Sequence, residues 1–290
     1  MIWKLSTQVY GKLMKSNWLF LVSTSNSVGR GHLNRCLVLA SEISAKCNVE
    51  FYSYENVKYS KEILKKYKNV KFFSSGLSKI RLNKYQGVLI DVKKNDKKLF
   101  KKFSKIKNSA IISDLDIKIS NIKKIISPTL EKRNTIEKYQ STLLGRKYYL
   151  ISKKYKKNKK KISKKVKNIL INFGYLDSKH FTFKVLEILN LTKYNEKVTV
   201  LIGRNFTLLK EINKKKYNFK LNIHSGLTDL RYFYKKADLC IGAGGIGMLE
   251  RFLYGIPSVT ISTSNDQNYA ILNAKKVGAT LTLKKYEKKK

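Results

Sequence analysis

The stretch Ser25-Asn-Ser-Val-Gly-Arg-Gly-His32-Leu-Asn-Arg-Cys-Leu-Val-Leu-Ala40 directly follows the apolar run Trp18–Val22. The apolar run predicts a buried strand, the glycines predict a loop, and the apolar spacing after His32 predicts a helix. Gly29 and Gly31 allow backbone angles that other residues avoid, and they let a ligand approach the main chain. A strand, a glycine loop and a helix in this order are typical of an α/β domain.

His32 is the strongest candidate for a catalytic group in the sequence. It falls in the first turn of the predicted helix, where free backbone N–H groups and the positive end of the helix dipole gather. That dipole opposes a positive charge on the imidazole, so we expect a neutral ring that can accept a proton near pH 7. The alternative is that His32 only caps or packs the helix, but the adjacent glycine loop favours catalysis.

The length and charge of the chain narrow the class of protein. Its 290 residues suffice for two domains, and 62 Lys and Arg against 19 Asp and Glu give a formal net charge of +43. The lysines are spread along the whole chain without a nucleic-acid-binding motif, so we do not expect nucleic acid as a partner. We expect a basic surface that attracts a phosphorylated substrate and makes at most weak, peripheral contact with an anionic membrane.

Cysteine usage and the absence of apolar spans indicate the compartment. The three cysteines have no metal-like spacing, and an odd number argues against a disulfide framework. No apolar run approaches the roughly 20 residues of a membrane span. The first 15 residues lack the apolar region of a signal peptide and are interpreted as an N-terminal extension. We therefore expect a cytoplasmic monomer that needs no cofactor or metal.

Apolar strands alternate with amphipathic helices in both halves of the sequence. This alternation predicts two Rossmann-like, doubly wound α/β domains that face a cleft, with the carboxyl ends of the strands toward it. A lysine-rich stretch without an apolar face predicts a solvated linker between them. The expected divisions are an extension at 1–15, a first domain at 16–152, a linker at 153–166 and a second domain at 167–290. The strands expected in the first domain are 18–23, 49–54, 70–73, 87–91, 110–113, 125–127 and 148–151.

A second glycine loop, Gly242-Ala-Gly-Gly-Ile-Gly247, follows a predicted strand and precedes a predicted helix. The free amides of Gly244, Gly245 and Ile246 could hold a diphosphate there. The loop has neither the lysine of a P-loop nor the dinucleotide-binding spacing. Glu250, about one turn into the helix, could accept both hydroxyls of a ribose. The alternatives are a tight turn for the loop and a surface charge for Glu250.

Carboxylates end several strands of the first domain. Asp91 closes the strand Gly87–Asp91 and could orient His32 or bind a substrate hydroxyl. Asp114 and Asp116 follow another strand and are weaker candidates. An aspartate at a strand end is often the cap of the next turn, and that alternative stays open for all three.

Further polar residues follow strands of the second domain. Gly203 and Arg204 end a predicted strand, and Arg204 could contact a phosphate or be an ordinary loop arginine. Asp266 and Gln267 lead into the last predicted helix, where they could cap the helix or reach a sugar.

Taken together, these motifs resemble a known family. Gly-x-Gly-His followed by Leu-x-Arg-Cys-Leu-x-Leu-Ala resembles the N-terminal signature of the UDP-2,4-diacetamido-2,4,6-trideoxy-β-L-altropyranose hydrolases of pseudaminic acid biosynthesis. SpsG-like spore-coat polysaccharide proteins share that family. Ala243-Gly-Gly, Glu250 and Gly255-Ile-Pro257 resemble the UDP site of the related MurG-type glycosyltransferases. The resemblance extends from Ser16 to Gly278.

The resemblance implies a glycosyltransferase-B (GT-B) architecture and a specific reaction. Water would attack the anomeric carbon of a UDP-sugar with inversion and release UDP, in the biosynthesis of a surface glycan. His32 would activate the water, with Asp91 as its catalytic partner. The residues implied at the sugar are Gly29, Gly31, Arg35, Asp266 and Gln267, and those implied at UDP are Gly203, Arg204, Gly244, Gly245, Ile246 and Glu250.

The chain departs from the family pattern around the sugar and the phosphates. Val92 and Lys93 follow Asp91 where the family has His-Tyr, Asp266 replaces an asparagine, and Gly247 replaces a serine or threonine. These changes leave two alternatives to the hydrolase. One is an inverting GT-B glycosyltransferase with a UDP-sugar donor, and the other is an inactive protein that only binds a nucleotide-sugar.

Overall fold

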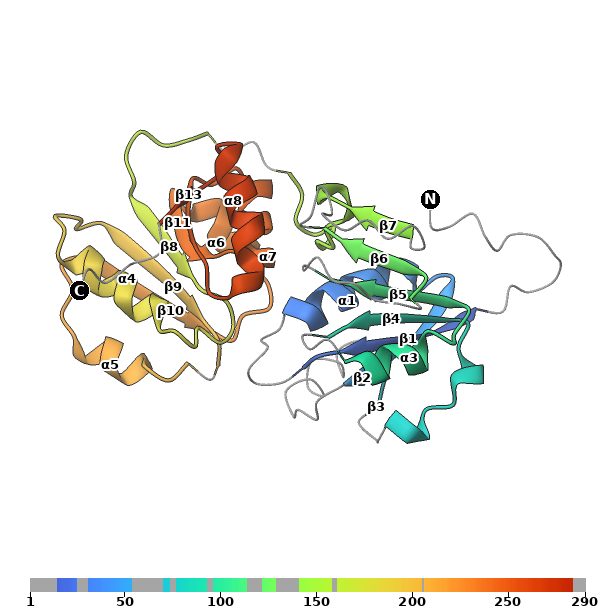
Figure 1. Cartoon of the computed structure of the whole chain (residues 1–290). Coiled ribbons are helices and arrows are strands. Elements are labelled where there is room, and N and C mark those ends of the chain that lie inside the picture. The colour runs from blue at the N-terminus through green and yellow to red at the C-terminus, as the bar shows by residue number, and fades with distance from the viewer. Residues whose placement is uncertain are drawn as a thin grey trace, which may run out of the picture.

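A computed structural model describes residues 15–24, 31–53, 70–73, 77–92, 96–113, 122–128, 141–157, 161–204 and 206–283. These residues form two lobes, each built on a sheet in which every strand pair is parallel (Figure 1). The predicted α/β class with two doubly wound sheets is therefore confirmed. The sequence also predicts a lysine-rich helix at 61–67, and these positions lie outside the described residues. No helix in the described ranges is both long and apolar enough to cross a membrane.

The first sheet has the strand order β3-β2-β1-β4-β5-β6-β7. Its central strands are apolar on both faces because helices or loops cover both sides. The strands are β1 Ser16–Val22, β2 Cys47–Ser53, β3 Val70–Phe73, β4 Gly87–Asp91, β5 Asn108–Ile112, β6 Lys124–Ser127 and β7 Ser141–Leu144.

Within the described ranges, two helices pack against this sheet. Helix α1, Gly31–Ile43, buries Leu33, Cys36, Leu37, Ala40 and Ile43, a helical spacing that forms one apolar face over the sheet. Helix α3, Lys97–Phe103, begins where the Asp96 carboxylate accepts the Leu99 N–H at 3.0 Å. It buries its apolar side chains in the other core of the lobe. Short 3₁₀ turns occur at η1 Leu77–Lys79, η2 Leu82–Lys84 and η3 Arg146–Tyr148.

The second sheet has the strand order β10-β9-β8-β11-β12-β13. Its strands are β8 Asn168–Asn172, β9 Lys197–Ile202, β10 Lys220–Ser225, β11 Leu239–Ala243, β12 Ser258–Ile261 and β13 Leu281–Thr282. The helices are α4 Phe181–Asn190, α5 Leu209–Lys214, α6 Arg231–Lys236, α7 Ile246–Leu253 and α8 Asn268–Lys276, with a 3₁₀ turn η4 at Asn265–Gln267.

One strand prediction in the first lobe is wrong. Residues 148–151 do not form a strand, and the edge strand is instead β7. Gly145 has a φ of +94° and turns the chain into η3, so Tyr148 and Leu150 pack on the core from outside the sheet. The sequence of β7, Ser-Thr-Leu-Leu, is half polar, as suits an edge strand, and therefore has no apolar run to reveal it.

The lysine-rich segment between the sheets also contains one buried contact. The lysines at 153–157 and 161–165, which the structure describes, are exposed. Tyr155, however, packs against Tyr234 and Tyr254 of the second lobe, with ring centroids 6.2 and 6.3 Å apart. This aromatic contact attaches the start of the segment to the second lobe.

The strand orders define where a ligand would bind. The order reverses between β1 and β4 in the first sheet and between β8 and β11 in the second. Ligands of open α/β sheets bind outside the carboxyl ends of the strands at such reversals. In Figure 1 the arrowheads of β4 to β6 point toward the second lobe, and α7 and α8 lie on the side of that lobe facing the first.

Candidate functional site

Asp91, the last residue of β4, is the centre of a compact polar cluster. Its side chain is 0% exposed, and Oδ1 lies 2.6 Å from Nδ1 of His32. Arg35 donates to both carboxylate oxygens, from Nε to Oδ2 at 2.6 Å and from Nη2 to Oδ1 at 2.6 Å. The Cys36 thiol donates to Oδ2 at 3.4 Å. The cluster stands at the strand-order reversal of the first sheet.

Helix α1 supplies all three partners of Asp91. His32, Arg35 and Cys36 are spaced i, i+3 and i+4, so one face of the helix carries them to the end of β4. The sequence predicted that Asp91 could orient His32. It did not predict the bidentate contact of Arg35 with Asp91, although the helical spacing contains the signal for it.

The contact with Asp91 fixes the tautomer of His32. Burial alone would raise the pKa of Asp91, but the charges of Arg35 and His32 and their hydrogen bonds hold that pKa well below its usual range. An ionised carboxylate only accepts, so the proton of a neutral His32 sits on Nδ1 and leaves the lone pair on Nε2. The side chain of His32 is 21% exposed, which leaves the ring accessible to a substrate.

The Gly242–Gly247 loop in the second lobe runs from β11 into α7. A Cβ on Gly242 would lie 2.2 Å from the carbonyl oxygen of Asn172, and one on Gly244 would lie 2.4 Å from Cδ1 of Ile271. Close backbone packing therefore requires glycine at 242, whereas a side chain at 244 would require the Ile271 side chain to shift. Gly245 is open by comparison, since its nearest neighbour would be Nε2 of Gln267 at 3.8 Å.

Glu250 of α7 lies beside this loop and is partly buried. Its Oε2 accepts the hydroxyl of the fully buried Tyr234 at 3.0 Å. Burial raises the pKa of Glu250 to about 7, against the opposing influences of the Tyr234 hydrogen bond and the Arg251 charge. Glu250 is thus a partly buried carboxylate that accepts a hydrogen bond from Tyr234 and has a raised pKa, unlike an ordinary surface carboxylate.

Arg251, the next residue of α7, was not predicted from the sequence. Its side chain is 1% exposed. Nη2 donates to the carbonyl oxygen of Ala243 at 3.0 Å and to Oγ1 of Thr260 at 3.3 Å, while Nε has no hydrogen-bond partner among the residues that the structure describes. Arginine is rarely fully buried, so a sequence pattern places it on the surface.

Gln267 contacts the glycine loop itself. Its Oε1 accepts the N–H of Gly244 at 3.2 Å and the N–H and hydroxyl of Thr263 at 3.1 and 3.0 Å. The Gln267 side chain, which was expected to reach a sugar, therefore binds the loop. The Gly244 amide, which was expected to bind phosphate, donates to that side chain.

Gly203 and Arg204 follow β9. A Cβ on Gly203 would lie 1.9 Å from the carbonyl oxygen of Tyr175, so packing alone requires glycine there. Arg204 is exposed, and its Cγ would lie 2.6 Å from a Cβ on Gly226, whose φ is +67°.

The predicted residues thus form two groups. His32, Arg35 and Asp91 are in contact in the first lobe, and Gly244 contacts Gln267 in the second. Gly31 begins α1, and a Cβ there would meet no atom of the described residues within 4 Å. Ile246 begins α7. Gly29, Lys93, Asp114 and Asp116 lie outside the described residues, as does the side chain of Asp266.

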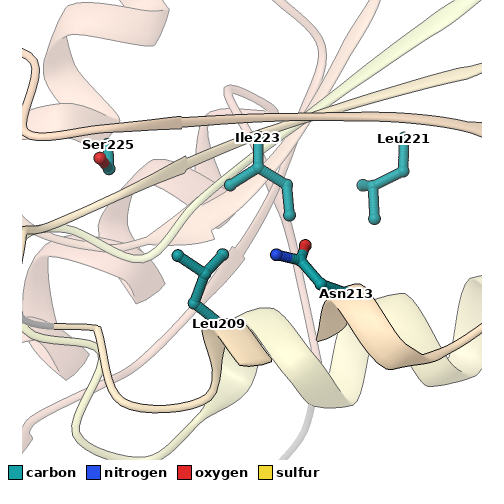
Figure 2. Close-up of a pocket in the computed structure, with 5 residues that line it drawn as sticks. All are labelled: Leu209, Asn213, Leu221, Ile223 and Ser225. Atoms are coloured by element: carbon teal, nitrogen blue, oxygen red, sulfur yellow. The ribbon is translucent and has the colours of Figure 1, made fainter. Parts of the chain in front are cut away.

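A surface hollow of about 370 Å³ lies elsewhere, between α5 and β10 (Figure 2). Figure 2 shows the side chains of Leu209 and Asn213 directed toward Ile223, with Leu221 and Ser225 on the same strand. None of these residues is a candidate site residue. Across the described ranges, no group of three or more His, Cys, Asp and Glu side chains could hold a metal ion.

Comparisons by sequence identify no family for this chain. No family model matches the chain. An uncharacterized protein of Methanocaldococcus jannaschii is 29% identical over 267 residues, which cover 82% of this chain and 54% of that protein. The chain therefore spans about half the length of this curated relative.

Solved structures of glycosyltransferases share the architecture at low sequence identity. MurG of Acinetobacter baumannii is 14% identical with a TM-score of 0.64, covering 93% of this chain and 86% of its own. The kitacinnamycin glycotransferase is 14% identical with a TM-score of 0.61, covering 94% and 87%. The spinosyn rhamnosyltransferase SpnG, solved with thymidine diphosphate, is 11% identical with a TM-score of 0.61, covering 93% and 86%. The chain therefore has the two-sheet GT-B fold of these glycosyltransferases.

Proposed function

We propose that this chain is an inverting GT-B enzyme that cleaves a UDP-sugar at its anomeric carbon and transfers the sugar to an acceptor. The observation that carries the proposal is the 2.6 Å contact between His32 Nδ1 and Asp91 Oδ1 at the strand-order reversal of the first sheet. The structural neighbours support a nucleotide-sugar donor, since one of them was solved with UDP and another with thymidine diphosphate.

His32 acts as the general base in this proposal. The Asp91 carboxylate accepts a hydrogen bond from the Nδ1–H of His32. Nε2 of His32 takes the proton of the acceptor hydroxyl. The acceptor oxygen forms a bond to the anomeric carbon, and the bond from that carbon to the UDP oxygen breaks with its electron pair. This single displacement yields a sugar linkage of inverted configuration, UDP and a protonated His32. Gly31, Arg35, Asp266, Gln267 and Gly29 are proposed to surround the sugar.

The second lobe binds UDP in this proposal. Backbone amides of the Gly242–Gly247 loop stabilise the negative charge that grows on the leaving diphosphate. Glu250 accepts the ribose hydroxyls, and Arg204 contacts a phosphate. The Gly244 amide donates to Gln267 within the lobe, so the amides of Gly245 and Ile246 are the expected donors to phosphate. The proposed domains are 16–152 for sugar and catalysis and 167–290 for UDP, joined by 153–166, in a cytoplasmic protein.

A second candidate is the hydrolase, in which water takes the place of the acceptor. One observation favours it. The three residues His32, Arg35 and Cys36 of the Gly-x-Gly-His and Arg-Cys motifs all contact Asp91, so the motif residues that resemble the hydrolase family form one unit. The sugar would then be a diacetamido-trideoxy hexose.

A UDP-release assay on a panel of UDP-sugars tests the proposal and separates the two candidates. A transferase releases UDP at a useful rate only when an acceptor alcohol is added, whereas a hydrolase releases it in buffer alone. In ¹⁸O-water, hydrolysis at carbon labels the sugar, and attack at phosphorus labels UDP. If the protein binds UDP tightly but cleaves no UDP-sugar under any condition, it is an inactive nucleotide-sugar-binding protein.

A further inference from the structure

The guanidinium of Arg251 is a buried positive charge without a carboxylate partner. Arginine stays protonated in proteins, and its side chain here is 1% exposed. Among the described residues Arg251 forms no ion pair, and Nε has no hydrogen-bond partner. The neighbouring carboxylate of Glu250 accepts from Tyr234 instead. The Arg251 charge lowers the pKa of Glu250, but burial still raises that pKa to about 7, so this carboxylate offsets the charge only in part. Burying an incompletely offset charge is costly, so a further negative group is expected nearby.

The guanidinium lies against the inner side of the Gly242–Gly247 loop. Its Nη2 donates to the carbonyl oxygen of Ala243 at 3.0 Å. Its Nη1 would lie 3.1 Å from a Cβ on Gly242 and 3.7 Å from a Cβ on Gly247. The guanidinium therefore contacts the loop at Ala243 and lies close to both of its ends, at the carboxyl end of β11 and the first turn of α7.

Three sources of positive potential thus coincide at one place. They are the loop amides, the amino-terminal end of α7 and the guanidinium beneath them. A diphosphate on the open side of the loop would supply the missing negative charge without contacting Arg251. At such short separations and in a partly dry environment, one charge changes anion affinity by roughly tenfold or more.

We infer that Arg251 is a positioning residue of the nucleotide site, which fixes the glycine loop through Ala243 and makes it selective for the diphosphate over an uncharged nucleoside. This inference rests on the proposed function, because it takes the bound anion to be the diphosphate of UDP. Arg251 acts through the loop and through its charge, whereas Glu250 contacts the ribose.

The test compares UDP with uridine, which carries no phosphate, by isothermal titration calorimetry on the full chain. The variants are Arg251→Met, which removes the charge at similar volume, and Arg251→Lys, which keeps it. Lys236→Met is the matched control, because it removes the same charge from the exposed end of α6. Thermal melts establish that each variant is folded.

We expect Arg251→Met to lower the preference for UDP over uridine by about tenfold or more. Loss of the charge beside Glu250 weakens the ribose contact of both ligands alike and so does not by itself change this preference. Arg251→Lys should keep the preference within about threefold of the wild type, and so should Lys236→Met. If Arg251→Met does not fold, Arg251→Lys alone decides, and a folded lysine variant without the preference overturns the inference. A folded methionine variant with the full preference overturns it as well. If the wild-type chain itself does not bind UDP, the proposed function fails, which is a different result.

Discussion

Nδ1 of His32 lies 2.6 Å from Oδ1 of Asp91, and the same carboxylate accepts two hydrogen bonds from Arg35. The aspartate is fully buried while the histidine is partly exposed, so the pair has an inner anchor and an outer reactive group. The arrangement gives the imidazole one defined tautomer with Nε2 available as a base. Each prediction below follows from this pair or from the glycine loop of the second lobe.

Replacing Asp91 by asparagine is expected to lower turnover by roughly 10²- to 10⁴-fold. The amide can donate to Nδ1, which favours the wrong tautomer and removes the lone pair from Nε2. Steady-state UDP release measures the effect, and the UDP dissociation constant should stay unchanged. Cys36→Ala is the matched control, since it removes only the 3.4 Å thiol contact with the same carboxylate. Equal losses in the two variants would mean that the cluster is structural.

Asp91 also predicts how stability depends on pH. Its pKa in the folded protein is held well below the value of about 4 expected in the unfolded chain. Its ionised form therefore stabilises the fold above pH 4, and that contribution is lost as the pH falls toward the folded-state pKa. Urea unfolding at pH 7 and pH 3 should show a large stability gap between wild type and Asp91→Asn at pH 7 and a smaller gap at pH 3. A gap independent of pH contradicts this assignment.

Glu250 predicts a pH dependence of nucleoside binding. Burial raises its pKa to about 7, and only the ionised form accepts both ribose hydroxyls. Uridine affinity should therefore rise between pH 6 and pH 8 and level off above. Uridine is the right ligand because it has no phosphate that titrates in this range. Glu250→Gln should bind more weakly, without this pH dependence, and a variant with the wild-type pH profile would rule out the ribose contact.

Two glycines should respond differently to alanine. At Gly31 a Cβ would meet no atom of the described part of the chain within 4 Å, and the residue begins α1, so Gly31→Ala should leave the melting temperature unchanged or raise it. Turnover should nevertheless fall, because the substrate is expected to approach the backbone there. At Gly244 a Cβ would lie 2.4 Å from Ile271, and alanine should cost about 1–3 kcal/mol of stability. Full activity of Gly31→Ala would show that its openness has no role in binding.

The fold was predicted well because both halves of the sequence alternate apolar strands with amphipathic helices. The error at β7 has a physical cause. An edge strand pairs with one neighbouring strand and is partly exposed, so its sequence carries no continuous apolar run. The apolar pattern predicts helices over 96–107 and 229–236, whereas α3 ends four residues earlier, at Phe103, and α6 begins two residues later, at Arg231. Local turns and caps decide such ends.

The site was predicted in part. Residue spacing pointed to His32 and to a strand-end role for Asp91, because a histidine at a glycine loop and an aspartate at a strand end are local features. The pairing of Arg35 with Asp91 joins positions 56 residues apart and needs the fold to bring them together. The burial of Arg251 and the contact of Gln267 with the loop depend on how α7 and α8 pack, which no local pattern contains.

The central claim is that the first lobe supplies the base and the second lobe binds the nucleotide. His32→Gln tests it most directly, with UDP release and the UDP dissociation constant measured on the same protein. Glutamine keeps a polar side chain next to Asp91 but cannot act as a base. The account predicts that turnover falls by roughly 10²- to 10⁴-fold while the dissociation constant stays within about twofold of the wild type. A folded His32→Gln protein that releases UDP at the wild-type rate would contradict the account.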